Sequence, residues 1–519
     1  MKGVLSLAAT VLLCVLGVTV RVAAQEQPKE SKPAEAKATS ESAPPKEESR
    51  VTDHTIRLGG QTIPYKATAS TTLIKDEKGE PAALIYSTAY TRSDIKDLTQ
   101  RPLAFLYNGG PGSSSIWLHM GAFGPRRVVT IDAAPTPPPP FQLADNGDSL
   151  LERADLVFID PVGTGFSHAA GKVQDKDFWG IDEDVKSLAQ FISIYVTRNN
   201  RWNSPKFLIG ESYGTFRSAA LGNYLQSHDG IYLNGIVLIS SVLDLTSLSF
   251  NPGDDMPYIY YLPSYAATAW YHKLLKDRPE DLNGFIAEAR RFASTEYAGA
   301  LMKGSNLSDA EKSDMARKLA HFTGLSEDYL TKANLRVTLA QFREELQRSR
   351  GLTTGRLDAR YSGPMYDLLS EKADYDPQST AVSGAFTAAF NNYIREDLKF
   401  GQDKTYKVWA EDAGREWNWK HSIGDRAFFP STPNVEQDLV EALITNPHLY
   451  VEVENGLYDL ATPFFATEYT MDHLGLPRNL RQNIQLRYYD AGHMMYLRVE
   501  DLAKLRSNID AFIEGAAAK

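Results

Sequence analysis

Short apolar runs and amphipathic segments alternate along much of this chain. Four runs are rich enough in apolar residues to form buried strands, at 103–107, 155–159, 206–209 and 235–239. Between the second and the third, the sequence has helical periodicity from about residue 182 to residue 198. Strands that alternate with helices build a mainly parallel sheet flanked by helices, so the pattern predicts an α/β fold.

The regions before and after these runs extend the predicted sheet. Residues 51–100 alternate polar and apolar positions, which indicates antiparallel strands that lead into the sheet. Near the C-terminus, residues 448–454 and 484–489 have the pattern of two further strands, and a helical pattern begins at about Glu500. We therefore expect the sheet to be built from both ends of the chain.

The pattern changes between residues 244 and 409. Segments there are helical and charged, and no series of strands appears. This predicts a mainly helical insertion that divides the core into two parts, 51–243 and 410–519, and forms a cap over the site. The clearest helical segments are 280–293, 309–322 and 336–350.

A tight turn follows the run at 206–209. Residues 210–214 read Gly-Glu-Ser-Tyr-Gly, and a helical pattern comes next. A strand, a Gly-x-Ser-x-Gly turn and a helix form a nucleophile elbow, in which the serine is strained and its oxygen stands clear of the sheet. Ser212 is therefore a candidate nucleophile, and the Tyr213 backbone N–H is placed to stabilise an oxyanion. By itself the pentapeptide is also compatible with a solvent-exposed glycine turn.

An acid and a histidine follow the two C-terminal strands in the order that this architecture requires. Asp459 comes after 448–454, and His493 comes after 484–489. In an open parallel sheet such loops share the edge at which ligands bind. We expect Ser212 to attack, His493 to take and return the proton, and Asp459 to orient the imidazole. Either loop residue alone would be an ordinary solvated side chain.

A second glycine turn follows the run at 103–107. Residues 108–115 read Asn-Gly-Gly-Pro-Gly-Ser-Ser-Ser. Glycines allow the backbone to approach a substrate closely and to direct N–H groups toward it. Beside a nucleophile elbow, this turn is the expected second donor to the oxyanion, although alone it is compatible with an ordinary Gly/Pro loop.

Five motifs occur together along the chain. They are the two glycine turns, the Asp-Pro-Val-Gly-Thr-Gly-Phe-Ser sequence at 160–167, the Gly-x-x-Asp that ends at Asp459 and the Ala-Gly-His-Met that contains His493. In these motifs and their order the chain resembles the serine carboxypeptidases, a branch of the α/β-hydrolase fold. The resemblance extends from about residue 103 to the C-terminus.

The resemblance implies a function and a set of site residues. The protein would be a serine-type carboxypeptidase that releases C-terminal residues from peptide substrates through an acyl-enzyme intermediate. Its catalytic triad would be Ser212, Asp459 and His493. Its oxyanion hole would be formed by the backbone N–H groups of Gly110 and Tyr213. The other expected site residues would bind the substrate and above all its C-terminal carboxylate: Asn108, Gly109 and Glu211.

The residues that would clamp this carboxylate depart from the family pattern. The usual tryptophan before the first glycine turn is Leu106, and a second acid is expected where the chain has Ala122. Arg126, Arg127 or His119 is a candidate replacement, because arginine binds carboxylates bidentately and keeps its charge at any working pH. The alternative is that both arginines are surface charges.

The incomplete clamp leaves other functions open. The same triad could serve a serine esterase, amidase or acyltransferase that does not read the carboxylate. A catalytically inactive binding module is a third possibility, but such proteins usually lack a member of the triad, and here all three residues are present.

The N-terminal residues have the composition of a targeting segment. Lys2 precedes an apolar stretch, and a Val-Ala-Ala cleavage site ends at Ala24, so residues 1–24 are expected to be a secretory signal peptide. Residues 25–50 have almost no apolar content, which predicts a disordered tether. The single cysteine, Cys14, would be removed with the signal, which excludes disulfides in the mature chain and favours a secreted or periplasmic protein.

Charge and the remaining motifs narrow the range of partners. The net charge of −10 comes without a basic stripe, so nucleic acid is not an expected partner. After the signal, no apolar stretch is long enough to span a membrane. Serine acyl transfer needs no cofactor, and the scattered histidines give no metal motif, so neither a cofactor nor a metal is expected. The sequence carries no indication of the oligomeric state.

Overall fold

The fold is known from a computed structural model, which describes residues 45–421 and 433–518. The expected signal peptide and residues 25–44 of the expected tether lie outside the described residues. Residues 45–50 do not continue that tether, which corrects its predicted end. The backbone N–H of Glu48 donates to Thr71 Oγ1 at 2.9 Å, and the first strand already begins at Ser49. An edge strand tolerates polar side chains because its hydrogen bonds come from the backbone.

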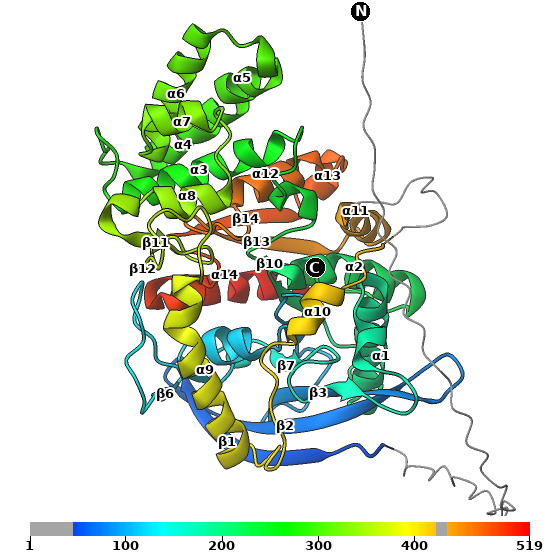
Figure 1. Cartoon of the computed structure of the whole chain (residues 1–519). Coiled ribbons are helices and arrows are strands. Elements are labelled where there is room, and N and C mark those ends of the chain that lie inside the picture. The colour runs from blue at the N-terminus through cyan, green and yellow to red at the C-terminus, as the bar shows by residue number, and fades with distance from the viewer. Residues whose placement is uncertain (1–44, 422–432, 519) are drawn as a thin grey trace, which may run out of the picture. The chain divides into compact units, whose positions relative to one another are not determined.

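The core of the protein is a ten-stranded sheet (Figure 1). Six neighbouring strands are parallel and reach one edge of the sheet, and three antiparallel strands, blue in Figure 1, extend it on the other side, as the sequence predicts. A short strand, β8 (His168–Ala169), pairs with β3. The other strands follow one another across the sheet in the order β1 (Ser49–Leu58), β2 (Gln61–Lys75), β3 (Pro81–Arg92), β7 (Asp155–Ile159), β4 (Leu103–Tyr107), β9 (Lys206–Glu211), β10 (Gly235–Ile239), β13 (Tyr450–Gly456) and β14 (Ile484–Tyr489).

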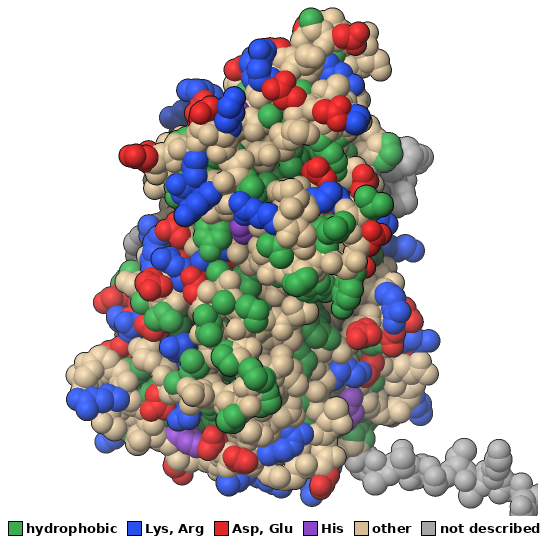
Figure 2. Space-filling view, turned by 60° about the vertical axis from the view of Figure 1, so that its left-hand side comes forward, with side chains coloured by type: hydrophobic (Ala, Val, Ile, Leu, Met, Phe, Trp, Pro, Cys, Tyr) green, Lys and Arg blue, Asp and Glu red, His purple; other side chains and the backbone are tan. Residues whose placement is uncertain are grey.

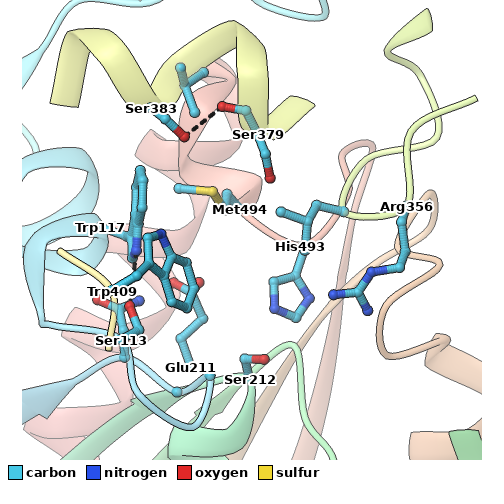
Figure 3. A pocket seen from close by; sticks show the side chains of 15 residues that line it. Ser113, Trp117, Glu211, Ser212, Arg356, Ser379, Ser383, Trp409, His493 and Met494 are labelled. Atoms are coloured by element: carbon cyan, nitrogen blue, oxygen red, sulfur yellow. Dashed lines mark hydrogen bonds between the residues drawn. The ribbon is translucent and has the colours of Figure 1, made fainter. Parts of the chain in front are cut away.

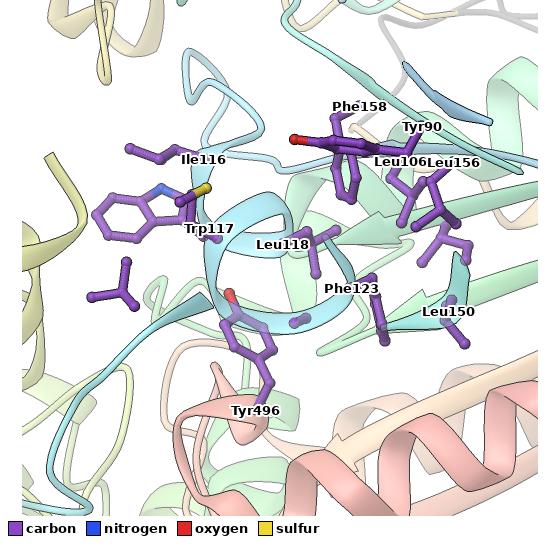
Figure 4. Close-up of a cluster of buried hydrophobic side chains, with 14 of the residues drawn as sticks. Tyr90, Leu106, Ile116, Trp117, Leu118, Phe123, Leu150, Leu156, Phe158 and Tyr496 are labelled. Carbon is purple, nitrogen blue, oxygen red and sulfur yellow. The ribbon is translucent and has the colours of Figure 1, made fainter. Parts of the chain in front are cut away.

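Helices cover both faces of this sheet. On one face, β4 side chains such as Phe105 join a buried apolar cluster with α1 (Ile181–Arg198), α2 (Tyr213–His228) and α11 (Glu436–Thr445). On the other face, Leu106 joins a second cluster with α14 (Val499–Ala517). Figure 4 shows part of this second cluster. Successive strand residues point to opposite faces, and burial of both faces explains why parallel strands such as β4 are continuous apolar runs.

The segment between β10 and α10 (Glu411–Glu416) is mainly helical, with one two-stranded hairpin. The expected helix at 336–350 is shorter than predicted, because Thr338 caps its start and the chain turns at Gly351, whose φ is +70°. The elements of this segment are α3 (Met256–Tyr271), α4 (Leu282–Phe292), α5 (Ala298–Lys303), α6 (Asp309–Thr323), α7 (Glu327–Lys332), α8 (Leu339–Glu345), β11 (Leu352–Thr354), β12 (Ser362–Pro364) and α9 (Pro377–Glu396).

The helices α3 to α8, green in Figure 1, have a hydrophobic core of their own, and this core includes the loop after β13. Leu457, Tyr458 and Leu460 of that loop belong to the same buried cluster as residues of α3, α4 and α6. The helical segment is thereby packed against the loop that carries Asp459. Other elements are a π-helical turn (Leu118–Phe123), β5 (Arg126–Val128), β6 (Leu143–Asp145), α12 (Phe464–His473) and α13 (Arg478–Arg481).

The surface carries charges of both signs. On the face shown in Figure 2, basic and acidic side chains are interspersed. Among the described helices, none is both long enough and apolar enough to cross a bilayer.

Candidate active site

Ser212 lies on the turn between β9 and α2, at the carboxyl edge of the sheet. Its backbone has φ 60° and ψ −129°, a conformation that costs a non-glycine residue about 1–3 kcal/mol and is typical of functional sites. The two glycines of the turn make room for it. A Cβ on Gly210 would lie 2.2 Å from the Gly214 carbonyl oxygen, and a Cβ on Gly214 would lie 2.9 Å from the Tyr107 carbonyl oxygen. The sequence therefore forms the elbow geometry expected for a nucleophile.

His493 and Asp459 lie on the loops after β14 and β13, and the structure brings them together. His493 Nδ1–H donates to Asp459 Oδ2 at 2.7 Å. The same carboxylate accepts the backbone N–H groups of Ala461 and Thr462 at 2.7 and 2.9 Å and the Thr462 hydroxyl at 2.8 Å. These bonds fix the carboxylate, which in turn assigns the proton to Nδ1 and leaves Nε2 free to act as a base.

The pKa of His493 reflects two opposing effects. Burial lowers it, but the charge of Asp459 and the hydrogen bond to it raise it, and the pKa ends above the ordinary value for histidine. Ser212 and His493 line the same cavity, and Figure 3 shows the imidazole next to the serine side chain. Among the described residues no hydrogen bond joins the two, as is common in unliganded sites, where such bonds tighten only with substrate.

The glycine turn after β4 lies directly against the elbow. A Cβ on Gly109 would lie 2.4 Å from the Tyr213 backbone nitrogen. Gly110 lines the cavity and has φ +106°, which only glycine adopts readily. Tyr213 is the first residue of α2, where backbone N–H groups have no acceptor within the helix. The expected oxyanion donors are thus adjacent to Ser212.

Two buried side chains hold this turn, and the sequence analysis assigned neither of them a role. Asp160 Oδ1 accepts both the backbone N–H and the hydroxyl of Ser115, at 2.8 and 2.7 Å. Arg217 on α2 donates from Nη1 to the Asn108 carbonyl at 2.7 Å and pairs with Asp184 at 2.6 Å. Asp160 stands in one of the recognised motifs, but a partner 45 residues away in the chain could not be read from it.

Asn108 and Glu211 lie on the floor of the same cavity. Asn108 Oδ1 accepts the Leu118 backbone N–H at 3.1 Å. Its buried Nδ2 makes no well-formed hydrogen bond to the described residues, but the amide lies beside the Glu211 carboxyl group and the Tyr496 hydroxyl. Burial raises the pKa of Glu211 to about 7. The Tyr496 hydroxyl donates to Glu211 Oε2 at 2.7 Å. The cavity floor therefore offers one amide donor without a well-formed hydrogen bond to the described residues, and one carboxyl group that is protonated in mildly acidic solution.

The residue that lies beside the Glu211 carboxyl group is Tyr496. The sequence analysis did not propose it as a member of the carboxylate clamp. Its ring packs against Gly121, where a Cβ would lie 2.6 Å from Tyr496 Cε2. Gly121 directly precedes Ala122, the position at which the second acid was expected. Figure 4 shows Tyr496 pointing toward this turn. Tyr496 follows His493 by three residues, so the only signal in the sequence was its place after the histidine motif.

The expectation that Arg126, Arg127 or His119 completes the clamp is wrong, because none of them lines the cavity. Arg126 belongs to β5 and pairs with Asp145 of β6 at 2.6 Å. His119 is buried in the core, where its ring is 4.3 Å from that of Phe158 and burial lowers its pKa to about 3.

The cavity has a volume of about 280 Å³ and an aromatic wall. The Trp117 and Trp409 rings are 6.1 Å apart, and Trp409 remains 49% exposed. Val382 of α9 and Met494 add further apolar surface. The opposite side carries Arg356, which the sequence analysis did not single out. In the described part of the chain, no group of three or more His, Cys, Asp or Glu side chains is arranged to hold a metal ion.

Comparison of sequences shows which known proteins this chain resembles. A family model described as serine carboxypeptidase matches residues 73–498. Serine carboxypeptidase-like 45 of Arabidopsis thaliana is 25% identical over 263 residues, which is 48% of this chain and 50% of that protein. The pheromone-processing carboxypeptidase KEX1 of Saccharomyces cerevisiae is 35% identical over 103 residues, 20% of this chain and 13% of that protein. The chain therefore spans about half the length, or less, of these curated relatives.

Comparison of structures points to the same fold. The crystal structure of a prohormone-processing carboxypeptidase from Saccharomyces cerevisiae, KEX1(delta)p, superposes with a TM-score of 0.54 at 18% sequence identity. The match covers 86% of this chain and 91% of that one. At this identity the likeness establishes the α/β-hydrolase fold.

Proposed function

Because the chain belongs to the serine carboxypeptidase family, we propose that it removes residues from the C-terminus of peptides through an acyl-enzyme intermediate. The observation that carries the proposal is one cavity that joins Ser212 and His493 with Asn108 and Glu211. The first pair supplies acyl-transfer chemistry, and the second pair supplies donors for a carboxylate.

The reaction starts at Ser212. Its Oγ attacks the scissile carbonyl carbon and transfers its proton to His493 Nε2, while Asp459 stabilises the imidazolium. The carbonyl oxygen becomes an oxyanion and accepts the N–H groups of Gly110 and Tyr213. His493 then protonates the leaving amine, the C–N bond breaks, and a water molecule hydrolyses the acyl-enzyme by the same route in reverse order.

The carboxylate of the leaving residue is bound beside Glu211. Asn108 Nδ2, which makes no well-formed hydrogen bond to the described residues, donates one hydrogen bond, and the protonated carboxyl group of Glu211 donates a second. Tyr496 donates to Glu211 Oε2 at 2.7 Å and so orients the carboxyl group. A neutral acid suits this role because an ionised Glu211 would repel the carboxylate.

Products from a blocked peptide test this proposal. With an N-acetylated peptide, mass spectrometry over time should show loss of one residue after another from the C-terminus. Cleavage at internal bonds, or no cleavage, would contradict it. Residues 1–24 also lead us to propose a secreted or periplasmic protein, and N-terminal sequencing of the mature chain would test cleavage after Ala24.

A second candidate is an esterase, amidase or acyltransferase that uses the same triad. The absence of an acid at Ala122 favours it, since a clamp with one carboxyl group binds a carboxylate less firmly. The Asn108 amide and the protonated Glu211 beside it, which together can donate to a carboxylate, oppose it.

The pH dependence of KM should follow the protonation state of Glu211. As the pH rises through about 7, Glu211 loses its proton, and KM for free-acid peptides should rise about tenfold per pH unit. Glu211→Gln keeps a neutral donor at every pH, so this rise should disappear. Steady-state kinetics between pH 5 and pH 9 would show it, with a C-terminal amide as the control substrate. The same rise in KM with the amide would rule out a role in carboxylate binding.

Tyr496→Phe should shift the pH dependence of KM for free-acid peptides. The Tyr496 hydrogen bond lowers the pKa of Glu211, so its removal should shift the rise in KM to higher pH. Loss of this orienting bond should also raise KM about fivefold in acidic solution. Tyr489→Phe is a matched control, because Tyr489 donates to the buried Glu454 at 2.8 Å, away from the cavity. An identical shift in both variants would contradict the proposed contact.

A further inference from the structure

Arg356 places a permanent positive charge at the wall of the cavity. Only three titratable side chains line the described cavity, those of Glu211, His493 and Arg356. In Figure 3, Arg356 stands on the opposite side of His493 from Glu211. Its guanidinium makes no hydrogen bond or ion pair with any of the described residues. The charge is therefore available to a ligand.

The backbone of Arg356 is fixed although its head group is free. Its N–H donates to Asp376 Oδ2, and its carbonyl accepts the Leu460 N–H at 3.0 Å. The next residue, Leu357, accepts the His493 backbone N–H at 2.6 Å. Arg356 is thus tied on one side to the loop of Asp459 and on the other to the loop of His493. A cation held in this way differs from an arginine on an open surface.

The nearby carboxylates are already matched by other arginines. Asp358 pairs with Arg360 at 2.7 Å, and Asp376 lies 3.6 Å from Arg343. Arg356 has no such partner, and guanidinium groups bind carboxylates in a bidentate manner when one is offered. A carboxylate of a bound substrate can therefore form the ion pair that Arg356 does not form with the described residues.

The direction of a bound peptide decides which substrate group reaches Arg356. With its C-terminal carboxylate at Asn108 and Glu211 and its scissile carbonyl at Ser212, the peptide must continue away from Glu211. Arg356 lies on that far side. Resting on the proposed function, we propose that Arg356 is a specificity-determining residue that binds an acidic side chain on the acyl part of the substrate, next to the scissile bond.

Esters test this proposal without a C-terminal carboxylate. The substrates are the ethyl esters of N-benzyloxycarbonyl-glutamate and N-benzyloxycarbonyl-glutamine, which differ in the charge of one side chain. The wild-type protein should hydrolyse the glutamate ester with a kcat/KM about tenfold higher or more. Arg356→Gln should abolish this preference, so that the ratio of kcat/KM for the glutamate ester to kcat/KM for the glutamine ester falls about tenfold, to near one. Arg356→Glu should instead favour the corresponding lysine ester.

A matched control removes the same charge elsewhere. Arg350→Gln alters an exposed arginine of the same segment that does not line the cavity, and it should keep the preference. Equal rates for the two esters in the wild type would overturn the proposal. So would an Arg356→Gln variant that loses affinity for all free-acid peptides alike, because Arg356 would then bind the C-terminal carboxylate.

The outcomes separate this inference from the proposed function. A preference for the glutamate ester, together with equal hydrolysis of free-acid and amidated peptides, would support the role of Arg356 and contradict the carboxypeptidase. Equal rates for the two esters, together with a strong preference for free-acid peptides, would support the carboxypeptidase and contradict the role of Arg356. Failure to hydrolyse any of these substrates would overturn both.

Discussion

Ser212→Ala should lower kcat/KM for every substrate by a factor on the order of 10⁴ or more, because Ser212 is the serine that stands on the elbow next to the His493 imidazole. The residual rate would come from the oxyanion donors and from substrate binding. The fold should be unaffected, since alanine removes one oxygen atom and no hydrogen bond of that oxygen to the described residues exists. Labelling by a fluorophosphonate should disappear together with activity.

The matched control for this variant is Ser227→Ala, an exposed serine on the same helix, α2. It should retain full activity and labelling. Appreciable hydrolysis by Ser212→Ala, with labelling at a different serine, would contradict the assignment of the nucleophile.

Asp459→Asn should reduce kcat by about 10⁴-fold at neutral pH. The carboxylate of Asp459 accepts the proton of His493 Nδ1, whereas an asparagine can donate its amide to Nδ1 and so move the proton to Nε2. An imidazole protonated at Nε2 cannot accept the proton of Ser212. Asp459 also raises the pKa of His493, so the acidic limb of any remaining activity should move to lower pH.

A buried aspartate outside the site provides the control. Asp501 pairs with Arg498 at 3.0 Å, and Asp501→Asn should leave kcat unchanged even if it lowers the melting temperature. Asp459→Asn should instead lower kcat and leave the melting temperature nearly unchanged. A loss of activity by Asp459→Asn that is no larger than its loss of folded protein would indicate a structural role only.

Much of the fold could be predicted from local patterns. The parallel strands β4, β7 and β10 are apolar runs because they are buried on both faces, and they have the predicted bounds. The predicted helix at 182–198 is α1, which begins one residue earlier. The predicted helix at 336–350 forms only as α8, which Thr338 caps at its start and which ends at Glu345, and helical periodicity alone does not show such ends.

The sequence predicted those site residues that belong to recognisable motifs, and it missed the others. Ser212, Asp459 and His493 follow strands of one sheet, so the topology itself brings their loops to one edge. Tyr496 and Glu211 are 285 residues apart, and nothing local in the sequence indicates their hydrogen bond. Arg126 was a poor candidate because the chain turns after Gly124 into the β5–β6 hairpin, where Arg126 pairs with Asp145.

Whether the cavity reads a C-terminal carboxylate is tested most directly by one N-blocked dipeptide, offered as the free acid and as the C-terminal amide. The clamp of Asn108 and Glu211 predicts that the wild-type protein hydrolyses the free acid at least tenfold faster below pH 7, and that Ser212→Ala hydrolyses neither. Equal rates, or activity on the amide alone, would contradict a carboxypeptidase and would leave a serine hydrolase that does not recognise the C-terminus.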